Sequence, residues 1–220
     1  MSSDSKFPIS NIILFIAAIG VLVAAFLVSK SNTPMRLLPI YGPKDYNITT
    51  KDTDYHKVLN FKLTSEMNHT ITLDSFKHKI FVANFFYATC PGICKKMNME
   101  LERATKNFVG NPYIKFVSYT VDPMRDSVPV LANYAKLHDA VPYQWYFLTG
   151  DKAEIYNLAR KSYFAAVDEG DGSNFVHTQN MALVDTAGYL RGFYSGTDSA
   201  EVNRMIIDIN LLLKEEKLSK

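Results

Sequence analysis

Cys90 and Cys94 are the only cysteines of the chain, and they stand four residues apart in the segment Thr89-Cys90-Pro91-Gly92-Ile93-Cys94. They follow an apolar run over 80–88 that predicts a buried strand, and Pro91 is typical of the first turn of a helix. A thiol at such a junction meets unpaired N–H groups and the positive end of the helix, which lower its pKa. Cys90 is therefore expected to be a reactive thiolate or a ligand for a soft metal.

The spacing of the two thiols leaves three kinds of chemistry open. Residues four apart on a helix have Cβ atoms about 5–6 Å apart, so both sulfurs can bind one ion. The same spacing permits a disulfide, for which the Cα separation extends to about 6.8 Å. The pair can therefore alternate between a metal-binding dithiol and an oxidised form, or it can be a structural disulfide.

Two further residues are expected at the same edge of the sheet. In an open α/β sheet, ligands bind at the carboxyl ends of the strands, where Cys90 is predicted to lie. Asp122 ends the next predicted strand and can approach the cysteine helix, although an Asp before Pro123 is also a common turn former. His177 precedes a later strand and is predicted to be the third ligand.

The other polar and sulfur-bearing residues near these positions have simpler interpretations. Arg125 and Asp126 are expected to form an ion pair that holds their loop. Met97 and Met99 could be soft ligands, but Met at helical spacing beside Met181 and Phe residues favours a role in the core.

Two thiolates and one imidazole form a soft donor set. Such a set selects copper, zinc or related ions. Three protein ligands without a fourth fit an open copper site better than a closed structural zinc site. The pattern of residues therefore favours copper.

The elements that must position these residues alternate between strands and helices. Apolar runs predict strands over 58–63, 70–73, 80–88, 113–121, 144–148, 180–185 and 189–194. Helices are predicted over 93–108, 127–137, 151–163 and 199–215. This order mixes crossover units with antiparallel hairpins, so the fold class is α/β with a mixed sheet.

The N-terminal part is predicted to differ from the remainder of the chain. The run Asn11–Val28 carries no charge, and its 18 residues are at the short end of a membrane span. A signal peptide is the alternative, but the run ends without a clear A-x-A cleavage pattern. The expected organisation is a tail at 1–10, a transmembrane anchor at 11–28, a proline-containing tether at 29–56 and one domain at 57–220. The domain is expected on the extracytoplasmic side.

Composition argues against nucleic acid as a partner. The chain has 24 Lys and Arg against 22 Asp and Glu, a net charge of +2, and its basic residues are scattered. It has no glycine-rich phosphate loop.

Three segments in order resemble the Sco/SenC family of thioredoxin-like copper proteins. They are the strand followed by Cys90-Pro91-Gly92-Ile93-Cys94, the segment Val121-Asp122-Pro123-Met124-Arg125-Asp126, and Val176-His177-Thr178. The similarity covers about residues 57–215.

The resemblance implies a thioredoxin-like sheet flanked by helices, with Cys90, Cys94 and His177 as copper ligands and Asp122 as an accessory residue. It also implies a protein that crosses the inner membrane once, with its domain in the periplasm. Its implied role is to load or reduce the dinuclear copper centre of cytochrome c oxidase subunit II or a related copper acceptor.

Some residues depart from the family pattern. Gly92 stands where many members have a polar or acidic residue, Lys95 replaces a frequent proline, and Val176 replaces a frequent acidic residue. The rival hypothesis is a thiol–disulfide oxidoreductase in which Cys90 attacks a partner disulfide and Cys94 resolves the mixed disulfide. The three-residue spacer and His177 favour copper binding.

Overall fold

The computed structural model describes residues 9–31, 37–49, 51–165 and 178–218. The chain divides into two compact units, Met1–Arg36 and Leu37–Lys220. The first unit contains one helix, α1 (Ile9–Ser31), whose side chains from 14 to 25 are exposed. Among residues 14–25 of α1 and the helices of the second unit, no helical stretch combines the length and the apolar character that a membrane crossing requires.

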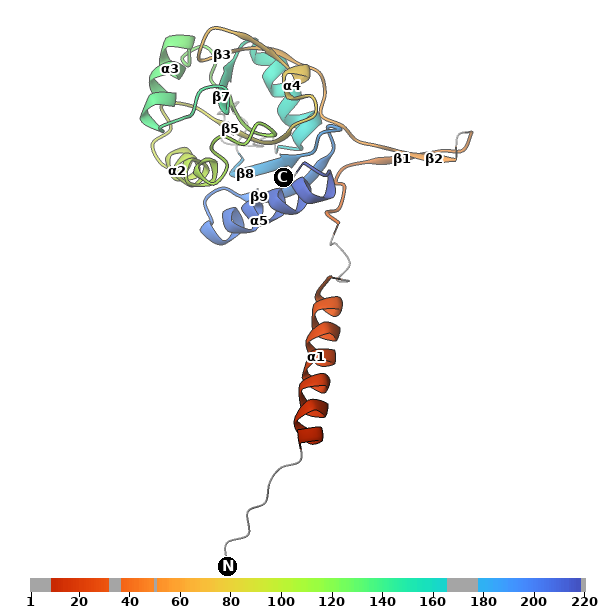
Figure 1. Cartoon of the computed structure of the whole chain (residues 1–220). Coiled ribbons are helices and arrows are strands. Elements are labelled where there is room, and N and C mark those ends of the chain that lie inside the picture. The colour runs from red at the N-terminus through yellow and green to blue at the C-terminus, as the bar shows by residue number, and fades with distance from the viewer. Residues whose placement is uncertain (1–8, 32–36, 50, 166–177, 219–220) are drawn as a thin grey trace, which may run out of the picture. The chain divides into compact units, whose positions relative to one another are not determined.

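The second unit is built on a seven-stranded mixed sheet (Figure 1). Its strand order is β4-β3-β7-β6-β5-β8-β9. The central strands β5, β6 and β7 are parallel, whereas β3, β4, β8 and β9 join antiparallel. The strands are β3 (Lys62–Ser65), β4 (Thr70–Thr72), β5 (Ile80–Phe86), β6 (Ile114–Thr120), β7 (Trp145–Thr149), β8 (Asn180–Val184) and β9 (Leu190–Ser195). The predicted α/β class with a mixed sheet is confirmed.

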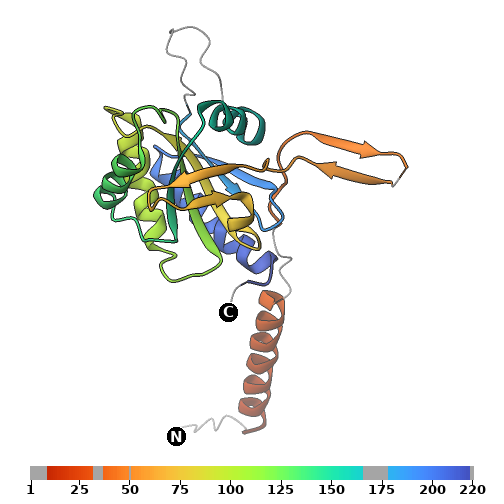
Figure 2. The same ribbon diagram turned by 90° about the horizontal axis from the view of Figure 1, so that it is seen from above.

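Helices cover both faces of this sheet, as the turned view also shows (Figure 2). The residues of α2 (Ile93–Lys106), α3 (Val128–Leu137) and α5 (Ser199–Glu215) pack into one core. The short helix η1 (Leu73–Phe76) and α4 (Lys152–Tyr163) pack into the core on the other face. Apart from η1, which was not predicted, the order of strands and helices from β3 to α5 is the predicted one.

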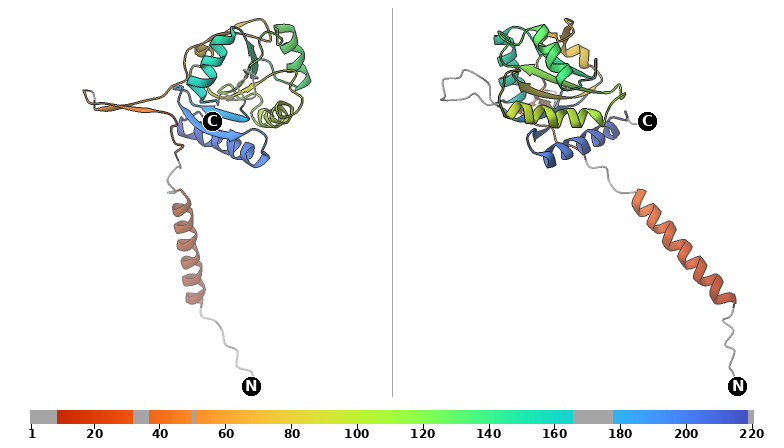
Figure 3. Two further views of the ribbon diagram at one scale, coloured as in Figure 1. Left: turned by 180° about the vertical axis from the view of Figure 1, so that it is seen from behind. Right: turned by 90° about the vertical axis from the view of Figure 1, so that its left-hand side faces the viewer.

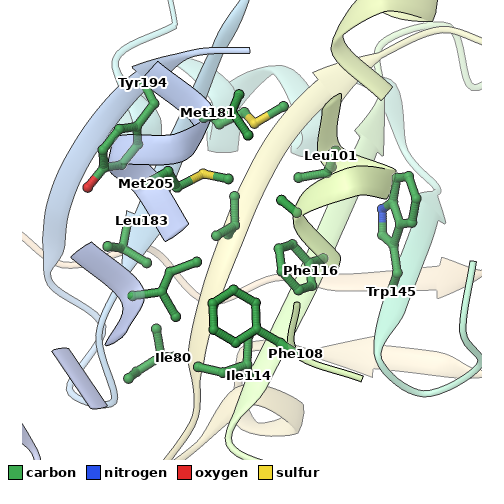
Figure 4. Packing of buried hydrophobic residues seen from close by; sticks show 14 of the residues in the cluster. Ile80, Leu101, Phe108, Ile114, Phe116, Trp145, Met181, Leu183, Tyr194 and Met205 are labelled. Carbon is green, nitrogen blue, oxygen red and sulfur yellow. The ribbon is translucent and has the colours of Figure 1, made fainter. Parts of the chain in front are cut away.

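Strand β5 shows why the sheet is buried on both faces. All seven of its residues are buried, and alternate side chains enter opposite cores, with Ile80 and Val82 on one side and Phe81 and Ala83 on the other. Figure 4 shows the first of these cores, where Ile80 packs near Phe108 and Ile114. Because both faces of a parallel strand between two helical layers are buried, its sequence is a nearly continuous apolar run.

Polar residues set the ends of several elements. Asp151 accepts a hydrogen bond from the Glu154 N–H at the start of α4, and Asp198 accepts one from the Ala200 N–H at the start of α5. Both are N-caps that satisfy otherwise unpaired backbone donors. Gly188, at φ +86°, allows the turn between β8 and β9 to adopt a left-handed conformation.

The structure differs from the sequence prediction between residues 37 and 65. Within the expected irregular tether it forms an antiparallel hairpin of β1 (Lys44–Asn47) and β2 (Asp52–Tyr55), which extends away from the sheet (Figure 3). Pro39 and Pro43 precede β1, so neither removes a donor from the ladder. The strand predicted over 58–63 forms later in the chain, as β3 at 62–65. Val58 and Phe61 lie in the segment before β3, and they are buried because this segment packs into the core.

Candidate functional site

The two cysteines lie where β5 gives way to α2. After Phe86 the chain forms a turn in which the Cys90 N–H donates to the Tyr87 carbonyl oxygen at 3.2 Å. Helix α2 then begins at Ile93, with Gly92 as its N-cap and no side chain capping it. The unpaired donors of this helix end are therefore left for the cysteine site.

Both thiols are free and they differ in exposure. Cys90 is half-buried, whereas Cys94 is 5% exposed and belongs to the core. The backbone N–H of Cys94 donates a hydrogen bond to Cys90 Sγ at 3.4 Å. The helix thus directs one of its free donors at the more accessible sulfur, as the sequence predicts for Cys90.

The environment moves the pKa values of the two thiols in opposite directions. Burial alone would raise the pKa of Cys90, but hydrogen bonds from the Cys94 thiol, from backbone N–H groups and from Tyr87 lower it below its ordinary value. Burial raises the pKa of Cys94 to about 12, and its hydrogen bond to Cys90 adds to this shift. The pair therefore combines a thiolate-forming Cys90 with a protonated Cys94.

Tyr87 is a site residue that the sequence prediction missed. Its hydrogen bond with Cys90 raises the pKa of Tyr87 to about 12, so it stays protonated. A phenol that donates to a thiolate stabilises the charged sulfur. Its position at the end of a strand, three residues before a reactive cysteine, is the signal that could have identified it.

Asp122 lies at the same edge of the sheet as the cysteines. It follows the end of β6, which is paired with the end of β5, and its negative charge contributes to the raised pKa of Tyr87. The predicted ion pair between Arg125 and Asp126 is not the one that forms. Arg125 Nε instead lies 3.8 Å from Asp122 Oδ2, because the side chain of Asp126 turns into the protein and is fully buried.

His177, the predicted third ligand, lies outside the described residues. Thr178 and Gln179, which follow it, line a pocket of about 340 Å³ together with Cys90 and Cys94. Within the described ranges, no group of three or more His, Cys, Asp and Glu side chains is arranged to hold a metal ion. The described part of the site supplies the two sulfur donors.

A second pocket of about 310 Å³ is lined by Cys90 on the α2–α3 side, together with Met99, Tyr134 and His138 among other residues.

The two methionines of α2 have different surroundings. Met97 is 1% exposed and packs in the core as predicted, whereas Met99 is 57% exposed. The prediction of a core role for Met99 was wrong because it lies on the side of α2 that faces away from the sheet.

A buried polar network connects α2 to the sheet beneath it. Asn84 Nδ2 donates to Asn98 Oδ1 at 3.2 Å, and Asn98 Nδ2 donates to the Tyr134 hydroxyl at 2.8 Å. Ser118 Oγ donates to Asn84 Oδ1 and accepts from Trp145 Nε1. Since Asn98 is one turn after Cys94, the network fixes the helix that carries both thiols.

Comparison with known proteins gives one consistent result. The family model for SCO1/SenC matches residues 49–213. The SCO1 protein homologue of Bacillus subtilis (strain 168) is 26% identical over 162 residues, which are 72% of this chain and 84% of that protein.

Solved structures share the fold of the second unit. BsSco, a member of the Sco family of cytochrome c oxidase assembly proteins in which a disulfide switch has been identified, is 26% identical, with a TM-score of 0.62 over 71% of this chain and 93% of that one. ScoI of Bradyrhizobium japonicum with copper bound is 23% identical, with a TM-score of 0.56 over 71% of this chain and 99% of that one.

Proposed function

The chain belongs to the SCO1/SenC family, and we propose that it binds copper as cargo and serves the assembly of the dinuclear copper centre of cytochrome c oxidase. The relatives named above support this role, since one is a cytochrome c oxidase assembly protein and another has copper bound. The observation that carries the proposal is the pair of free thiols at the junction of β5 and α2, with a helix N–H directed at Cys90 Sγ.

The chemistry of these donors suits a soft ion. Cys90 is the sulfur that ionises first, and Cys94 lies on the next turn of the same helix, so both can turn toward one ion. His177 is proposed as the third ligand and Asp122 as an accessory residue at the rim. Because Cys94 is protonated before copper binds, binding releases its proton and becomes more favourable as the pH rises.

The same thiols allow a coupled redox step. When Cys90 and Cys94 form a disulfide they lose two electrons and two protons, and a disulfide in the copper acceptor takes up both and opens to two thiols. The step prepares the acceptor's cysteines for copper. It also removes the two thiolates, so a molecule that has acted as reductant cannot hold copper until it is reduced.

A second candidate function rests on the opposite pKa shifts of the two thiols. A low-pKa Cys90 and a high-pKa Cys94 match the attacking and resolving cysteines of a thiol–disulfide oxidoreductase. In that case reduction of extracytoplasmic protein disulfides would be the main activity and copper would be incidental.

The proposed location is the inner membrane, with α1 as a single-pass anchor and the second unit in the periplasm. The support is the charge-free run Asn11–Val28. An engineered Cys in the 40–50 segment of a chain that lacks Cys90 and Cys94 tests this topology. It should react with a membrane-impermeant reagent in intact cells, whereas protection there together with labelling of the N-terminal tail would reverse the orientation.

Copper titration of the reduced unit 37–220 tests the function. We expect about one copper ion per chain, and we expect that Cys90→Ala, Cys94→Ala and His177→Ala each weaken binding. His78→Asn is the matched control, because His78 is exposed and has φ +58°, a region that Asn tolerates. Binding by His177→Ala equal to that of the control would remove His177 from the ligand set.

The oxidised protein separates the two candidate functions. Copper at a thousandfold excess over its dissociation constant should stabilise the reduced unit by about 4 kcal/mol, and it should not stabilise the disulfide form through this site. Equal stabilisation of both forms would place copper elsewhere. Catalytic reduction of protein disulfides without a copper effect would favour the oxidoreductase.

A further inference from the structure

Asp126 lies beneath the Cys90 turn and is completely buried, with an exposed fraction of 0%. Its Oδ2 atom accepts a hydrogen bond from the Ala88 N–H at 3.0 Å and another from the Thr120 hydroxyl. Ala88 is two residues before Cys90, and Thr120 is the last residue of β6. One carboxyl oxygen therefore joins the turn that carries Cys90 to the end of the neighbouring strand.

The backbone around Asp126 holds this carboxyl in place. The Asp126 N–H donates to the Asp122 carbonyl oxygen at 2.9 Å, and the Asp122 N–H donates to Thr120 Oγ1 at 3.0 Å. The Asp126 side chain thus helps to join the loops after β5 and β6. A substitution that removes the carboxyl releases the Ala88 end of the turn.

The second carboxyl oxygen is left without a partner. Among the described residues, Asp126 Oδ1 is the buried side-chain oxygen or nitrogen that makes no hydrogen bond. Arg125, whose positive charge acts on Asp126, has a side chain that is 75% exposed and pairs with Asp122. Burying an ionised carboxylate in this way is strongly unfavourable unless it is paired.

The groups facing Asp126 also favour its neutral form. Burial raises the pKa of Asp126, and the charge of Asp122 raises it further, while hydrogen bonds and Arg125 act in the opposite direction. Tyr134 of α3 lies within electrostatic range of the carboxyl, and burial raises the pKa of Tyr134 to about 12, so it contributes no charge. Within the part of the chain that the structure describes, no cation pairs with Asp126 to hold it in its ionised state.

We propose that Asp126 is a positioning residue that holds the Cys90 turn as an uncharged carboxylic acid, so that the turn is fixed without a second negative charge beside the Cys90 thiolate. Oδ2 is then the carbonyl oxygen that accepts both hydrogen bonds, and Oδ1 carries the proton. A carboxylate here would disfavour the Cys90 thiolate by like-charge repulsion. The inference rests on the proposed function only in taking Cys90 as the reactive sulfur.

The test is the pH profile of Cys90 alkylation in the reduced full-length chain in detergent. Iodoacetamide is the probe, and tandem mass spectrometry of the tryptic peptide 80–95 resolves Cys90 from Cys94. Asp126→Asn keeps one acceptor oxygen and never carries a charge. Its profile should match that of the parent at neutral pH, as should that of Asp74→Asn, an exposed control. A midpoint clearly below the parent's in Asp126→Asn would mean that Asp126 is charged, which overturns the proposal.

Asp126→Ala removes the acceptor that holds the Cys90 turn. It should raise the pH midpoint of Cys90 alkylation by about one unit, which slows alkylation at neutral pH about tenfold. If this variant does not fold, Thr120→Val, which loses one of the two donors, should shift the midpoint in the same direction by less. A folded variant with the parent profile would show that Asp126 does not position Cys90.

Copper titration of the same proteins separates this inference from the proposed function. If the parent binds copper and a folded Asp126→Ala variant keeps the parent's alkylation profile, the inference fails and the function stands. If the parent binds no copper but the variants behave as expected, the function fails and the inference stands.

Discussion

Two buried ionisable side chains of this protein have very different surroundings. Arg191, on β9, is 6% exposed; its guanidinium lies 3.0 Å from Asp185 Oδ2 and 2.5 Å from Glu215 Oε1. It also donates to the carbonyl oxygens of Leu38 and Pro39. Asp126, beneath the cysteine turn, has two donors on one oxygen and none on the other.

The difference separates a structural site from a chemical one. Arg191 ties the first residues of the second unit to β9 and α5, and both of its carboxylate partners neutralise it, so nothing there is left to react. The cysteine edge leaves a carboxyl oxygen unpaired and a thiol half-buried. Incomplete pairing costs stability, and in this protein it occurs beside the two sulfurs.

The largest expected effect is at Arg191. Arg191→Met leaves the buried Asp185 and the partly buried Glu215 without their shared cation, which should lower the free energy of unfolding by about 3–5 kcal/mol. Urea denaturation measures this loss. Arg160→Met, at an exposed position of α4, is the matched control and should change stability by about 0.5 kcal/mol or less. Similar losses in both variants would show that the Arg191 cluster is no stronger than a surface contact.

A smaller effect is expected in the polar network beneath α2. Asn98→Ala leaves Asn84 Nδ2 buried without its acceptor and should cost about 1–3 kcal/mol. Asn210→Ala removes an exposed amide that donates to one carbonyl, and it should cost less than about 1 kcal/mol. Equal costs would indicate that water replaces Asn98 in the network.

The two thiols should differ at least about tenfold in alkylation rate near pH 7.5, a difference equivalent to about 1.4 kcal/mol. Cys90 should react first, with a midpoint below the ordinary thiol value of about 8.5, because its pKa is lowered and that of Cys94 is raised to about 12. The rates are measured by mass spectrometry in the reduced chain. Equal rates would contradict the assignment of Cys90 as the thiolate.

The smallest effect is expected at Arg125, the exposed cation of the cysteine edge. Arg125→Gln removes its pair with Asp122, and because the Arg125 side chain is 75% exposed, stability should change by about 0.5 kcal/mol or less. Thermal unfolding measures the change. A loss as large as that of Arg191→Met would remove the distinction between the two regions.

Much of the fold could be predicted from the chain alone. The apolar runs at 80–88 and 113–121 indicated the central strands, because parallel strands covered on both faces contain little but apolar residues. The junction after the first run correctly placed Cys90 and Cys94 at a helix start. The hairpin at 44–55 could not be predicted in this way, since its strands are polar and extend from the core.

For the site, residue types determined the sulfur chemistry, because two thiols four residues apart can always share an ion or a disulfide. His177 stays a prediction. Only the tertiary structure decided which partners the polar residues take. Arg125 and Asp126 are adjacent in sequence, but their surroundings differ. The Arg125 side chain is exposed and pairs with Asp122, whereas Asp126 is buried beneath the turn that carries Cys90. Burial and pairing depend on how the loops after β5 and β6 meet, and local sequence does not contain that information.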